Sequence, residues 1–559
     1  MSVLRTIKHM SIFQGLKPIV GPSSSHTTAP FVASFLVYRL FEKGFLENDI
    51  IHHVEIHGRE RGDLPYRGHR TFGAIVAGYR GIYLDDEDSL SRTILESAFG
   101  DPDKLRPRVY YHQLSHQETL KGAVFRLCFI SKYGDTVLEA YSLGGGTVEP
   151  RFLEGVAKRY LRDVSALEAL SSIVFDREFE TRKGIPLWLY LSFGSLLGKL
   201  CSAASEYFNK DPDELLSLID ERQRLYASFS TIVRNSKSEK AKLHEYVLRL
   251  EEKLLGSDIV DKLLEKYIEI VLRTKTRCYD VLKMACERVR DIFYVSSMFV
   301  ENIEDIMMEL KNLATGLRSV RNTMFYAFIT MLRVLSSRII LSAPTAGSAG
   351  IVPAVLCTLY DMLGQGRDAV EALKSALVIA GLVNVVAANR ASTSGSLHGC
   401  QAEIGVALSM AAAAYAYILS DYDSDTAERA AVFALRTVLG LPCDPVLGFV
   451  EIPCVERNII LSEIAILSAK LALSGASPLM TLDNIIDTMK ITGQLLPQTI
   501  KEQAYGPLSC VFLSEKTEKL INTLQTLEKE QTQNITDTIH KFKDILKVIS
   551  TFLRQAEWN

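Results

Sequence analysis

The 559-residue sequence has no surplus of either charge, since 63 lysines and arginines stand against 66 aspartates and glutamates, a formal net charge of −3. This balance argues against a basic nucleic-acid-binding protein and against an acidic disordered chain. Long apolar runs are missing too, because the most apolar stretches, 375–388 and 404–419, fall short of the ~18–20 residues that a membrane span needs. We therefore expect two buried helices and no nucleic-acid or membrane partner. An apolar signal region is absent from the first residues, which favours the cytoplasm.

Cysteine is scarce, with nine residues and no CxxC pair, so a disulfide framework is not expected. Three of them, Cys400, Cys443 and Cys454, lie beside glycine or proline, where loop and helix-end N–H groups can stabilise a thiolate. Their spacing leaves three interpretations open: three buried thiols, a zinc site completed by His398, or an iron–sulfur cubane. A cubane normally takes four cysteines, so three would leave one iron open as a Lewis acid.

Composition divides the chain into four expected parts. Residues 1–153 alternate like an α+β domain, with strands predicted at 54–57, 123–130 and 137–143, a turn at 132–135, and helices at 29–40 and 73–79. Residues 154–319 are highly charged and predict amphipathic helices, as a coiled-coil or hairpin insertion, with no strand before 340. Residues 320–514 are rich in small residues and predict a compact all-α domain. Residues 515–559 carry an apolar seam from Ile535 to Leu553, suited to docking on the body or on a second subunit.

Three polar segments could surround such a site. Hydroxyl groups precede the helix predicted at 29–40, where free N–H groups favour an anion, although a simple capping segment would look the same. The segment 68–71 contributes His69 and Thr71, and a lone histidine is more often structural than catalytic. The loop 343–350 could offer N–H and hydroxyl donors to a carboxylate, or it could be a tight helical corner.

Together these segments resemble the iron–sulfur-dependent L-serine dehydratases (L-serine ammonia-lyases) in their single-chain form. The resemblance covers roughly 1–155 and 320–510, and its motifs keep the family's order along the chain. They are GPSSSHT at 21–27, GHRT at 68–71, YSLGGG at 141–146, APTAGSAGIVPAVL at 343–356, SGSLHGCQAEIG at 394–405, GLPCDPVLG at 440–448 and VEIPCVERN at 450–458.

The resemblance implies a serine dehydratase β-like domain followed by a mainly all-α catalytic domain, and suggests a homodimer. It implies a [4Fe–4S] cluster held by Cys400, Cys443 and Cys454, which deaminates L-serine to pyruvate and ammonia without pyridoxal phosphate. The candidates for acid–base or positioning roles are His69, His26 and Thr71. The candidate substrate or pocket residues are Ser23, Ser24, Ser25, Thr27, Thr345, Gly347, Ser348, Asn389, Ser394, Gln401 and Glu403.

The chain departs from the family pattern at several positions. Phe72 and Leu397 stand where the family usually has acidic residues, and Arg436 and Thr437 where it usually has an acid and a histidine. These departures predict an altered pocket and keep two alternatives open. One is a related elimination such as L-cysteine desulfuration. The other is a non-catalytic iron–sulfur protein with a sensing or structural role.

Overall fold

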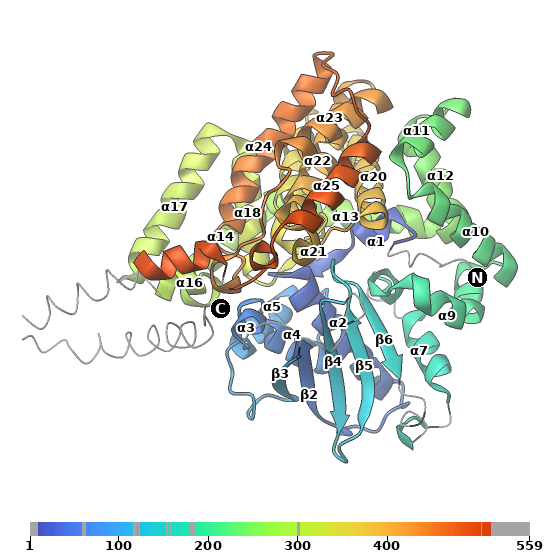
Figure 1. Ribbon diagram of the computed structural model, residues 1–559, viewed down its shortest axis with the longest axis vertical. Helices are drawn as coiled ribbons and strands as arrows, with labels where there is room; N and C mark the ends of the chain where they lie inside the picture. Colours follow the sequence, from blue (N-terminus) through green and yellow to red (C-terminus); the bar gives the residue numbers. More distant parts are fainter. Residues whose placement is uncertain are drawn as a thin grey trace, which may run out of the picture.

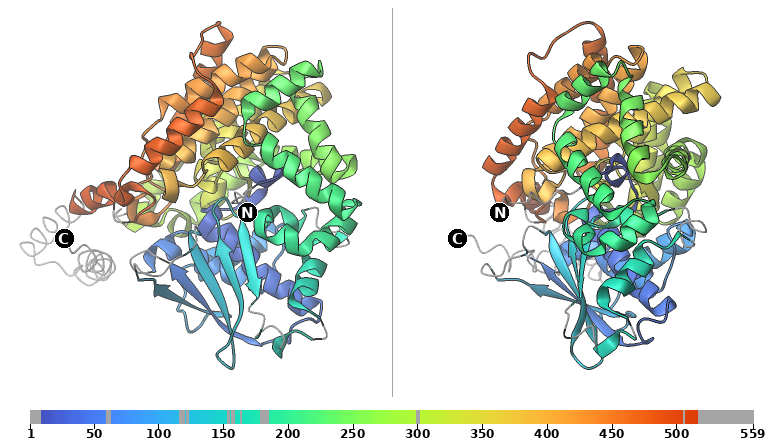
Figure 2. Two further views of the ribbon diagram at one scale, coloured as in Figure 1. Left: turned by 45° about the vertical axis from the view of Figure 1, so that its right-hand side comes forward. Right: turned by 90° about the vertical axis from the view of Figure 1, so that its right-hand side faces the viewer.

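In the computed structural model of the chain, a mixed five-stranded sheet lies at one end of the molecule and a mostly helical part at the other (Figure 1). Figure 2 shows the same division from two further sides. The structure describes residues 9–515 except 59–62, 116–119, 121–122, 153–154, 156–158, 163, 178–184, 299–301 and 505. The predicted order, an α/β region before a mostly helical one, is confirmed. The apolar seam expected near the C-terminus lies outside the described residues.

The sheet forms where the sequence alternates apolar and polar residues. Its strands run in the order β3-β2-β4-β5-β6, in which β2 and β3 are parallel and the other neighbours antiparallel. Gly134, at φ +89°, lies in the turn that joins β4 to β5 at the predicted place. All three predicted strands are confirmed, as β2, β4 and β5. The strands are β2 (Ile51–Gly58), β3 (Arg108–Gln113), β4 (Phe125–Ser131), β5 (Thr136–Ser142) and β6 (Val148–Phe152).

Helices cover one face of this sheet and leave the other facing outward. α2 (Ala29–Glu42) and α4 (Thr71–Tyr79) lie behind the sheet in Figure 1 and confirm the two helices predicted for this region. Val54 and Ile56 of β2 are buried, whereas His53, Glu55 and His57 of the same strand are partly exposed. Successive side chains of a strand point to opposite faces, so the three polar residues share the outer face.

The N-terminal segment ties the two parts together. α1 (Ile12–Gly15) packs on α20 (Arg367–Arg390), and Asn384 of α20 donates a hydrogen bond of 2.7 Å to the carbonyl oxygen of Gly15. β1 (Pro18–Val20) then pairs antiparallel with β7 (Ile339–Leu341). β7 corrects the prediction of no strand before residue 340. Its three buried apolar residues show no alternation, and only pairing with the distant β1 makes them a strand.

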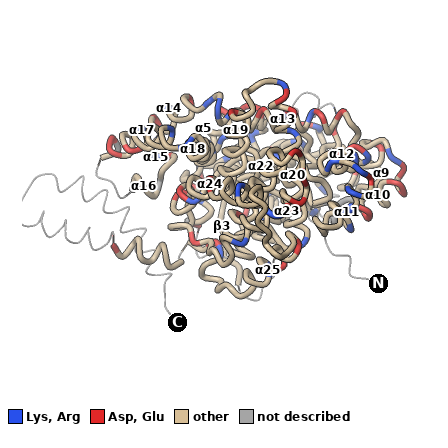
Figure 3. Tube along the Cα trace, turned by 90° about the horizontal axis from the view of Figure 1, so that it is seen from above, with Lys and Arg blue, Asp and Glu red and all other residues tan. Residues whose placement is uncertain are grey.

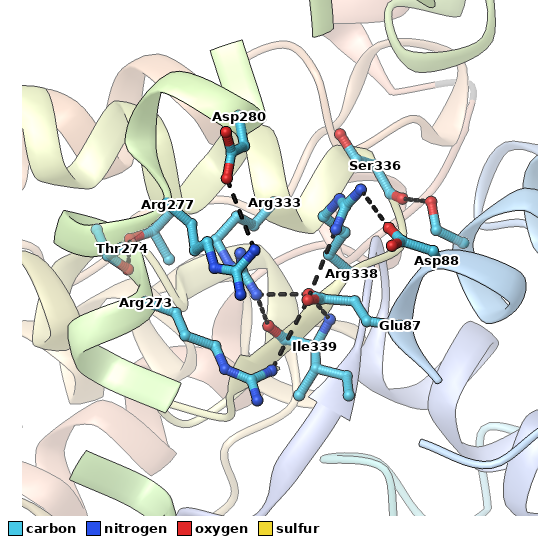
Figure 4. A network of polar contacts seen from close by, with 12 residues as sticks. Glu87, Asp88, Arg273, Thr274, Arg277, Asp280, Arg333, Ser336, Arg338 and Ile339 are labelled. Atoms are coloured by element: carbon cyan, nitrogen blue, oxygen red, sulfur yellow. Dashed lines mark hydrogen bonds and ion pairs between the residues drawn. The ribbon is translucent and has the colours of Figure 1, made fainter. Parts of the chain in front are cut away.

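A carboxylate at the start of α5 (Glu87–Ser97) makes a second connection (Figure 4). Glu87 accepts hydrogen bonds from the guanidinium of Arg333, at 2.5 Å, and from the N–H of Ile339, at 3.0 Å. Arg273 and Arg338 lie 3.7 and 3.6 Å from the same carboxylate. A negative charge in the first turn also stabilises the helix dipole. Several charges together therefore hold α5 against the helical part.

The described residues of 193–320 are mostly helical, as their charge pattern predicts, and α10 and α12 carry both acidic and basic residues (Figure 3). The stretch is neither a free coiled coil nor a projecting hairpin, because α12 packs on α20 and α13 on α19. Glu251 of α12 is fully buried, where it binds Arg222 of α10 and Ser11 of the N-terminal segment. The main helices are α9 (Phe193–Phe208), α10 (Pro212–Leu225), α11 (Phe229–Ser238), α12 (Leu243–Leu255), α13 (Ser257–Thr276), α14 (Cys278–Glu287) and α17 (Ile303–Val320).

The remaining helices enclose a core rich in alanine. Two stretches, Arg367–Arg390 and Cys400–Leu419, are long and apolar enough to cross a membrane, but 83% of each apolar window is buried inside the molecule. Small side chains let α22 pack closely on α20, α23 and α24. The two predicted buried helices are confirmed. The core helices are α18 (Asn322–Leu335), α19 (Ile351–Met362), α20, α22 (Ile404–Leu419), α23 (Ser424–Thr437), α24 (Cys454–Leu473) and α25 (Leu482–Leu495).

Candidate active site

Three cysteines from separate segments meet between the sheet region and the helical part. Cys400 begins a short 3-10 turn after α21 (Gly395–His398), Cys443 lies in the loop after α23, and Cys454 is the first residue of α24. The Sγ atoms of Cys400 and Cys443 and a carboxylate oxygen of Glu403 lie within 4.8 Å of one another. Cys454 lines the same pocket as Cys443 and Glu403. Three segments that span 54 positions of the sequence, from Cys400 to Cys454, thus bring three thiols to one place.

The backbone on both sides of Cys443 is held by the segment 500–502. The N–H of Cys443 donates to the carbonyl of Ile500 at 2.9 Å, and its carbonyl accepts from the N–H of Glu502 at 2.6 Å. Glu502 adopts a left-handed conformation, at φ +60°, and its side chain lines the pocket. A non-glycine residue in this conformation costs roughly 1–2 kcal/mol, which the surrounding contacts must offset.

Asn458 connects the helix of Cys454 to the loop 343–350. Its side-chain amide donates to the carbonyls of Gly347, at 2.7 Å, and Cys454, at 2.8 Å. Its side-chain oxygen accepts from the N–H of Gly350 at 2.9 Å. All these partners are backbone groups, so Asn458 fixes the distance between the loop and the cysteine without reaching into the pocket itself.

The charges around the thiols favour one thiolate. A hydrogen bond from Cys443 lowers the pKa of Cys400, and the same bond, together with burial, raises the pKa of Cys443. Burial alone would lower the pKa of Arg457. The nearby cysteines, of which Cys400 has the largest effect, act in the opposite direction and raise the pKa overall. Burial also raises the pKa of Glu403, against hydrogen bonds from Thr345 and Cys443 that lower it. Arg457 is therefore the cation that stabilises negative sulfur here.

Two buried histidines form the opposite side of the site. Their ring centroids lie 4.6 Å apart, and His69 lines the pocket while His26 lies behind it. The Nδ1 atom of His69 is buried and has no hydrogen-bond partner within the described part of the chain. Burial lowers the pKa of His69 to about 4, and burial followed by the charge of His69 lowers that of His26. Both rings are accordingly neutral near pH 7.

The hydroxyl segment forms a single turn of π-helix (Ser24–Thr28) capped by Ser23. The Oγ of Ser23 accepts from the N–H of His26 at 3.2 Å, and the N–H of Ser23 donates to Thr27 Oγ1 at 3.0 Å. The Oγ of Ser25 lies 3.0 Å from Nδ1 of His26. The segment is thus both a capping segment and part of the pocket wall, because the bonds that build the turn leave Ser23 and Ser24 lining the pocket.

The structure brings most of the predicted site residues together. One pocket is lined by Ser23, Ser24, His69, Thr345, Gly347, Glu403, Cys443 and Cys454, joined by Glu502. Directly behind this lining lie Ser25, His26, Thr27, Thr71 and Ser348, whose polar groups bind one another or nearby backbone, while Cys400 reaches Glu403 and Cys443 from the side.

Three further predicted residues belong neither to this lining nor to the residues directly behind it. The amide of Asn389 binds both backbone groups of His9. The amide of Gln401 is fully used by the carbonyls of His398 and Met489 and the N–H of Gly440. Ser394 lines a smaller pocket beside Gly144. Asn389 and Gln401 accordingly support the fold around the site.

Comparison with known proteins decides the family. Residues 219–509 match the family described as the serine dehydratase alpha chain. The chain belongs to this family. It is 40% identical over 182 residues to the probable L-serine dehydratase alpha chain of Bacillus subtilis, a match that covers 33% of this chain and 59% of that one. It is 28% identical over 519 residues to the L-serine dehydratase of Helicobacter pylori strain 26695, covering 89% of this chain and 98% of that protein. The resemblance to single-chain serine dehydratases is thereby confirmed.

The family match extends over helices that the sequence analysis set apart. It begins at residue 219, within α10, so α11 to α17 belong to the serine dehydratase alpha-chain region of this chain. Their contacts with α19 and α20 agree with this assignment.

The departures from the family pattern lie away from the thiols. Arg436 and Thr437 are exposed at the end of α23, where they bind the carbonyls of Pro478 and Phe433. Leu397 is 40% exposed, and Phe72 is buried beneath the guanidinium of Arg67. The described pocket lining contains none of these four. The altered pocket stays a prediction, because position along a motif does not reveal which side of a helix end faces the site.

Sequence reasoning missed three residues of this serine dehydratase site: Glu502, Arg457 and Asn458. Glu502 lies in none of the motifs quoted above, so none of them pointed to it. Arg457 and Asn458 follow Cys454 by three and four positions. This is the spacing of neighbours on one helical face, and that signal could have found them.

Proposed function

We propose that this chain is an L-serine ammonia-lyase that holds a [4Fe–4S] cluster on Cys400, Cys443 and Cys454. The observation that carries the proposal is the meeting of these thiols, from three separate segments, beside the unpartnered Nδ1 of His69. The names of the relatives in Bacillus and Helicobacter support serine as the substrate. A cytoplasmic homodimer belongs to the same proposal and rests on the expectations from the sequence alone.

The chemistry of the donor set fits an iron–sulfur cluster better than zinc. Thiolates are the usual protein ligands of a cubane, and three of them leave one iron free for substrate. The Cys3His zinc site considered from the sequence would use His398, which the described pocket lining does not include. The side chain of His398 instead packs against Gly493 of α25. A Cβ added at Gly493 would lie 2.5 Å from the Cβ of His398.

The chain's own residues suit a β-elimination. When bound, the cluster would supply a Lewis acid for the hydroxyl and carboxylate of serine. His69, neutral at pH 7 and with a free Nδ1, would accept the proton from Cα. The hydroxyls of Ser24 and Thr345 would bind the carboxylate, and Glu403 or Glu502 the ammonium group. Loss of the proton and of hydroxide leaves aminoacrylate, which tautomerises to an imine and hydrolyses to pyruvate and ammonia.

His26 would position His69 rather than touch substrate. It lies behind His69 and is itself enclosed by Tyr66 and Phe125, with ring centroids 5.4 and 5.0 Å away. Its Nδ1 is directed at Ser25, at 3.0 Å, and lies 3.9 Å from a carboxylate oxygen of Glu502. A ring packed on four sides cannot rotate freely, so it presents a fixed wall to the catalytic imidazole.

The test is pyruvate formation from L-serine by protein purified without oxygen and reconstituted with iron and sulfide. Wild type should be brown and active. Cys443→Ser should lose the cluster and the activity together, whereas Cys201→Ser, at a cysteine on α9 outside the site, should keep both. His69→Ala should keep the cluster and lose about 10²–10⁴-fold in turnover, the usual contribution of a general base.

Other outcomes separate the alternatives. A loaded protein that releases sulfide from L-cysteine but no pyruvate from L-serine would indicate a different elimination. A loaded protein inactive on both would indicate a sensing or structural role. Full cluster content in Cys443→Ser would overturn the ligand assignment.

A further inference from the structure

The outer face of the sheet carries a cluster of histidines that the reaction does not use. β2 places His53, Glu55 and His57 at alternate positions on this face. β3 runs parallel beside β2 in a register that pairs His57 with His112. The rings of His57 and His112 stack with centroids 5.1 Å apart and planes inclined by 22°. Two neighbouring strands therefore hold three imidazoles and one carboxylate on a rigid backbone.

The three imidazoles converge on the single carboxylate of Glu55. Its oxygens lie 2.9 Å from Nε2 of His57, 3.3 Å from Nε2 of His53 and 3.5 Å from Nε2 of His112. Within the described residues Glu55 makes ion pairs with these histidines alone. Two arginines stand opposite the histidines on the neighbouring strands: Arg126, opposite His57, pairs with Glu139, and Arg108, opposite His53, contacts His52. No lysine or arginine in the described chain neutralises Glu55, and neutral imidazoles would leave its charge to another cation.

We propose that His57, His112, Glu55 and His53 form a binding site for a divalent transition metal of the zinc type on the outer face of the sheet. Imidazole nitrogen and carboxylate oxygen are the ligands that Zn²⁺ prefers after thiolate, whereas Mg²⁺ and Ca²⁺ favour oxygen alone. His53 and His112 approach one oxygen of Glu55 and His57 approaches the other, so a shared metal requires the imidazoles to rotate toward a common point.

The site is open to ions from solvent. The side chains of His53, His57 and Glu55 are 20%, 17% and 25% exposed, and that of His112 is 50% exposed. The histidine cluster is separate from the cysteine pocket. His26, behind that pocket, packs on the buried side chain of Phe125 of β4, whereas the residues of the cluster lie on the outer face of the sheet. Cys128 faces Glu55 across the β2–β4 pairing, but burial raises the pKa of its thiol to about 12, so it stays protonated.

The experiment titrates Zn²⁺ into cluster-loaded protein, so that the cysteine pocket is occupied, and follows binding by calorimetry against a zinc chelator. Wild type should bind one Zn²⁺ per chain. His57→Ala and His112→Ala should each weaken binding by about 100-fold or more, since altering even a partner of a metal ligand costs roughly 10–100-fold. The control is His244→Ala, at a histidine of α12 whose ring contacts Tyr417, and it should bind as wild type does.

A second measurement identifies the ligands and guards against misfolding. Co²⁺ bound at this site should show no thiolate-to-metal charge-transfer band, and the isosteric Glu55→Gln should abolish the rise in melting temperature that Zn²⁺ causes in wild type. Equal affinity in wild type, His57→Ala and His112→Ala would overturn the proposal. So would a thiolate band that persists in His57→Ala, because the metal would then be bound by cysteine.

Discussion

His69 and His26 hold each other in place through the threonines that follow them. The hydroxyl of Thr27, next to His26, donates to the carbonyl of His69, and the hydroxyl of Thr71, two residues after His69, donates to the carbonyl of His26. Both bonds are 2.6 Å long and fully buried. These bonds join two segments that lie about forty residues apart in the sequence, at the positions of the two histidines. The threonines therefore position the imidazoles.

Thr71→Val should therefore reduce turnover without removing the cluster. The change keeps the shape of the side chain but removes the hydroxyl that donates to the buried carbonyl of His26, which costs about 1–3 kcal/mol. Thr71→Ser restores the hydroxyl and should recover both melting temperature and kcat. Equal activity in Thr71→Val and wild type would show that the reciprocal bonds do not position the histidines.

Gly395→Ala should empty the cluster site while leaving the protein folded. A Cβ at this position would lie 2.9 Å from Sγ of Cys443 and 2.5 Å from a carboxylate oxygen of Glu403. Both atoms are ends of side chains that can move, so the fold tolerates the change, but their movement displaces a proposed ligand. Iron content and the circular dichroism spectrum measure the two effects separately.

The control for this variant is Gly316→Ala. Gly316 lies within α17, and the methyl group of an alanine there would meet nothing within 4 Å outside its own stretch of helix. The change should therefore raise stability by roughly 0.5–1 kcal/mol and leave iron content unchanged. Normal iron content in Gly395→Ala would contradict the close packing inferred around Cys443.

The sequence predicted those features that depend on neighbouring residues. Alternation located β2, β4 and β5, and glycine or proline beside Cys400, Cys443 and Cys454 correctly marked them as loop and helix-end residues. Features that depend on distant partners were missed. The three residues of β7 become a strand only by pairing with β1, and Glu502 enters the pocket only because the backbone of Cys443 binds the segment 500–502.

The charge pattern led to one wrong expectation, that the helices of 193–320 form an insertion apart from the core. The helices of 193–320 are rich in charged residues, which indicates solvent exposure, yet α12 and α13 pack on α20 and α19. An amphipathic pattern shows that a helix has a face to bury but does not identify the surface that buries it. Arg436 and Thr437 illustrate the same limit, because the motif aligns them with pocket residues whereas the end of α23 leaves both exposed.

Glu251→Gln should destabilise the whole protein. The buried carboxylate accepts hydrogen bonds from Ser11 at 2.6 Å, from the N–H of Ile12 at 3.3 Å, and from Arg222 at 3.1 Å, and Tyr226 donates a further short bond. Removing its charge leaves Arg222 buried and uncompensated, which typically costs about 3–5 kcal/mol. The denaturant midpoint measures the loss.

Its neighbour Glu252 provides the control, since it is exposed on the same helix and its change to glutamine should move the midpoint very little. Equal midpoints for the two variants would mean that the network around Glu251 contributes no more than a surface charge.

Lys17→Met should raise stability most at and below neutral pH. The ammonium group of Lys17 is fully buried, with Thr147 Oγ1 at 2.8 Å as its hydrogen-bond partner, and burial lowers its pKa from 10.5 to about 7. Between these two values the unfolded chain binds a proton that the folded chain has released, so wild-type stability rises with pH across that window. Below about pH 7 the folded protein carries the full cost of a buried charge.

Methionine removes this cost, and the melting temperature of Lys17→Met should therefore exceed that of wild type at neutral pH by a margin that shrinks as the pH approaches 10.5. Lys104, whose side chain is 83% exposed, gives the comparison, because Lys104→Met should follow the wild-type pH profile throughout. A margin for Lys17→Met that stays constant with pH would show that Lys17 is not neutral in the folded protein.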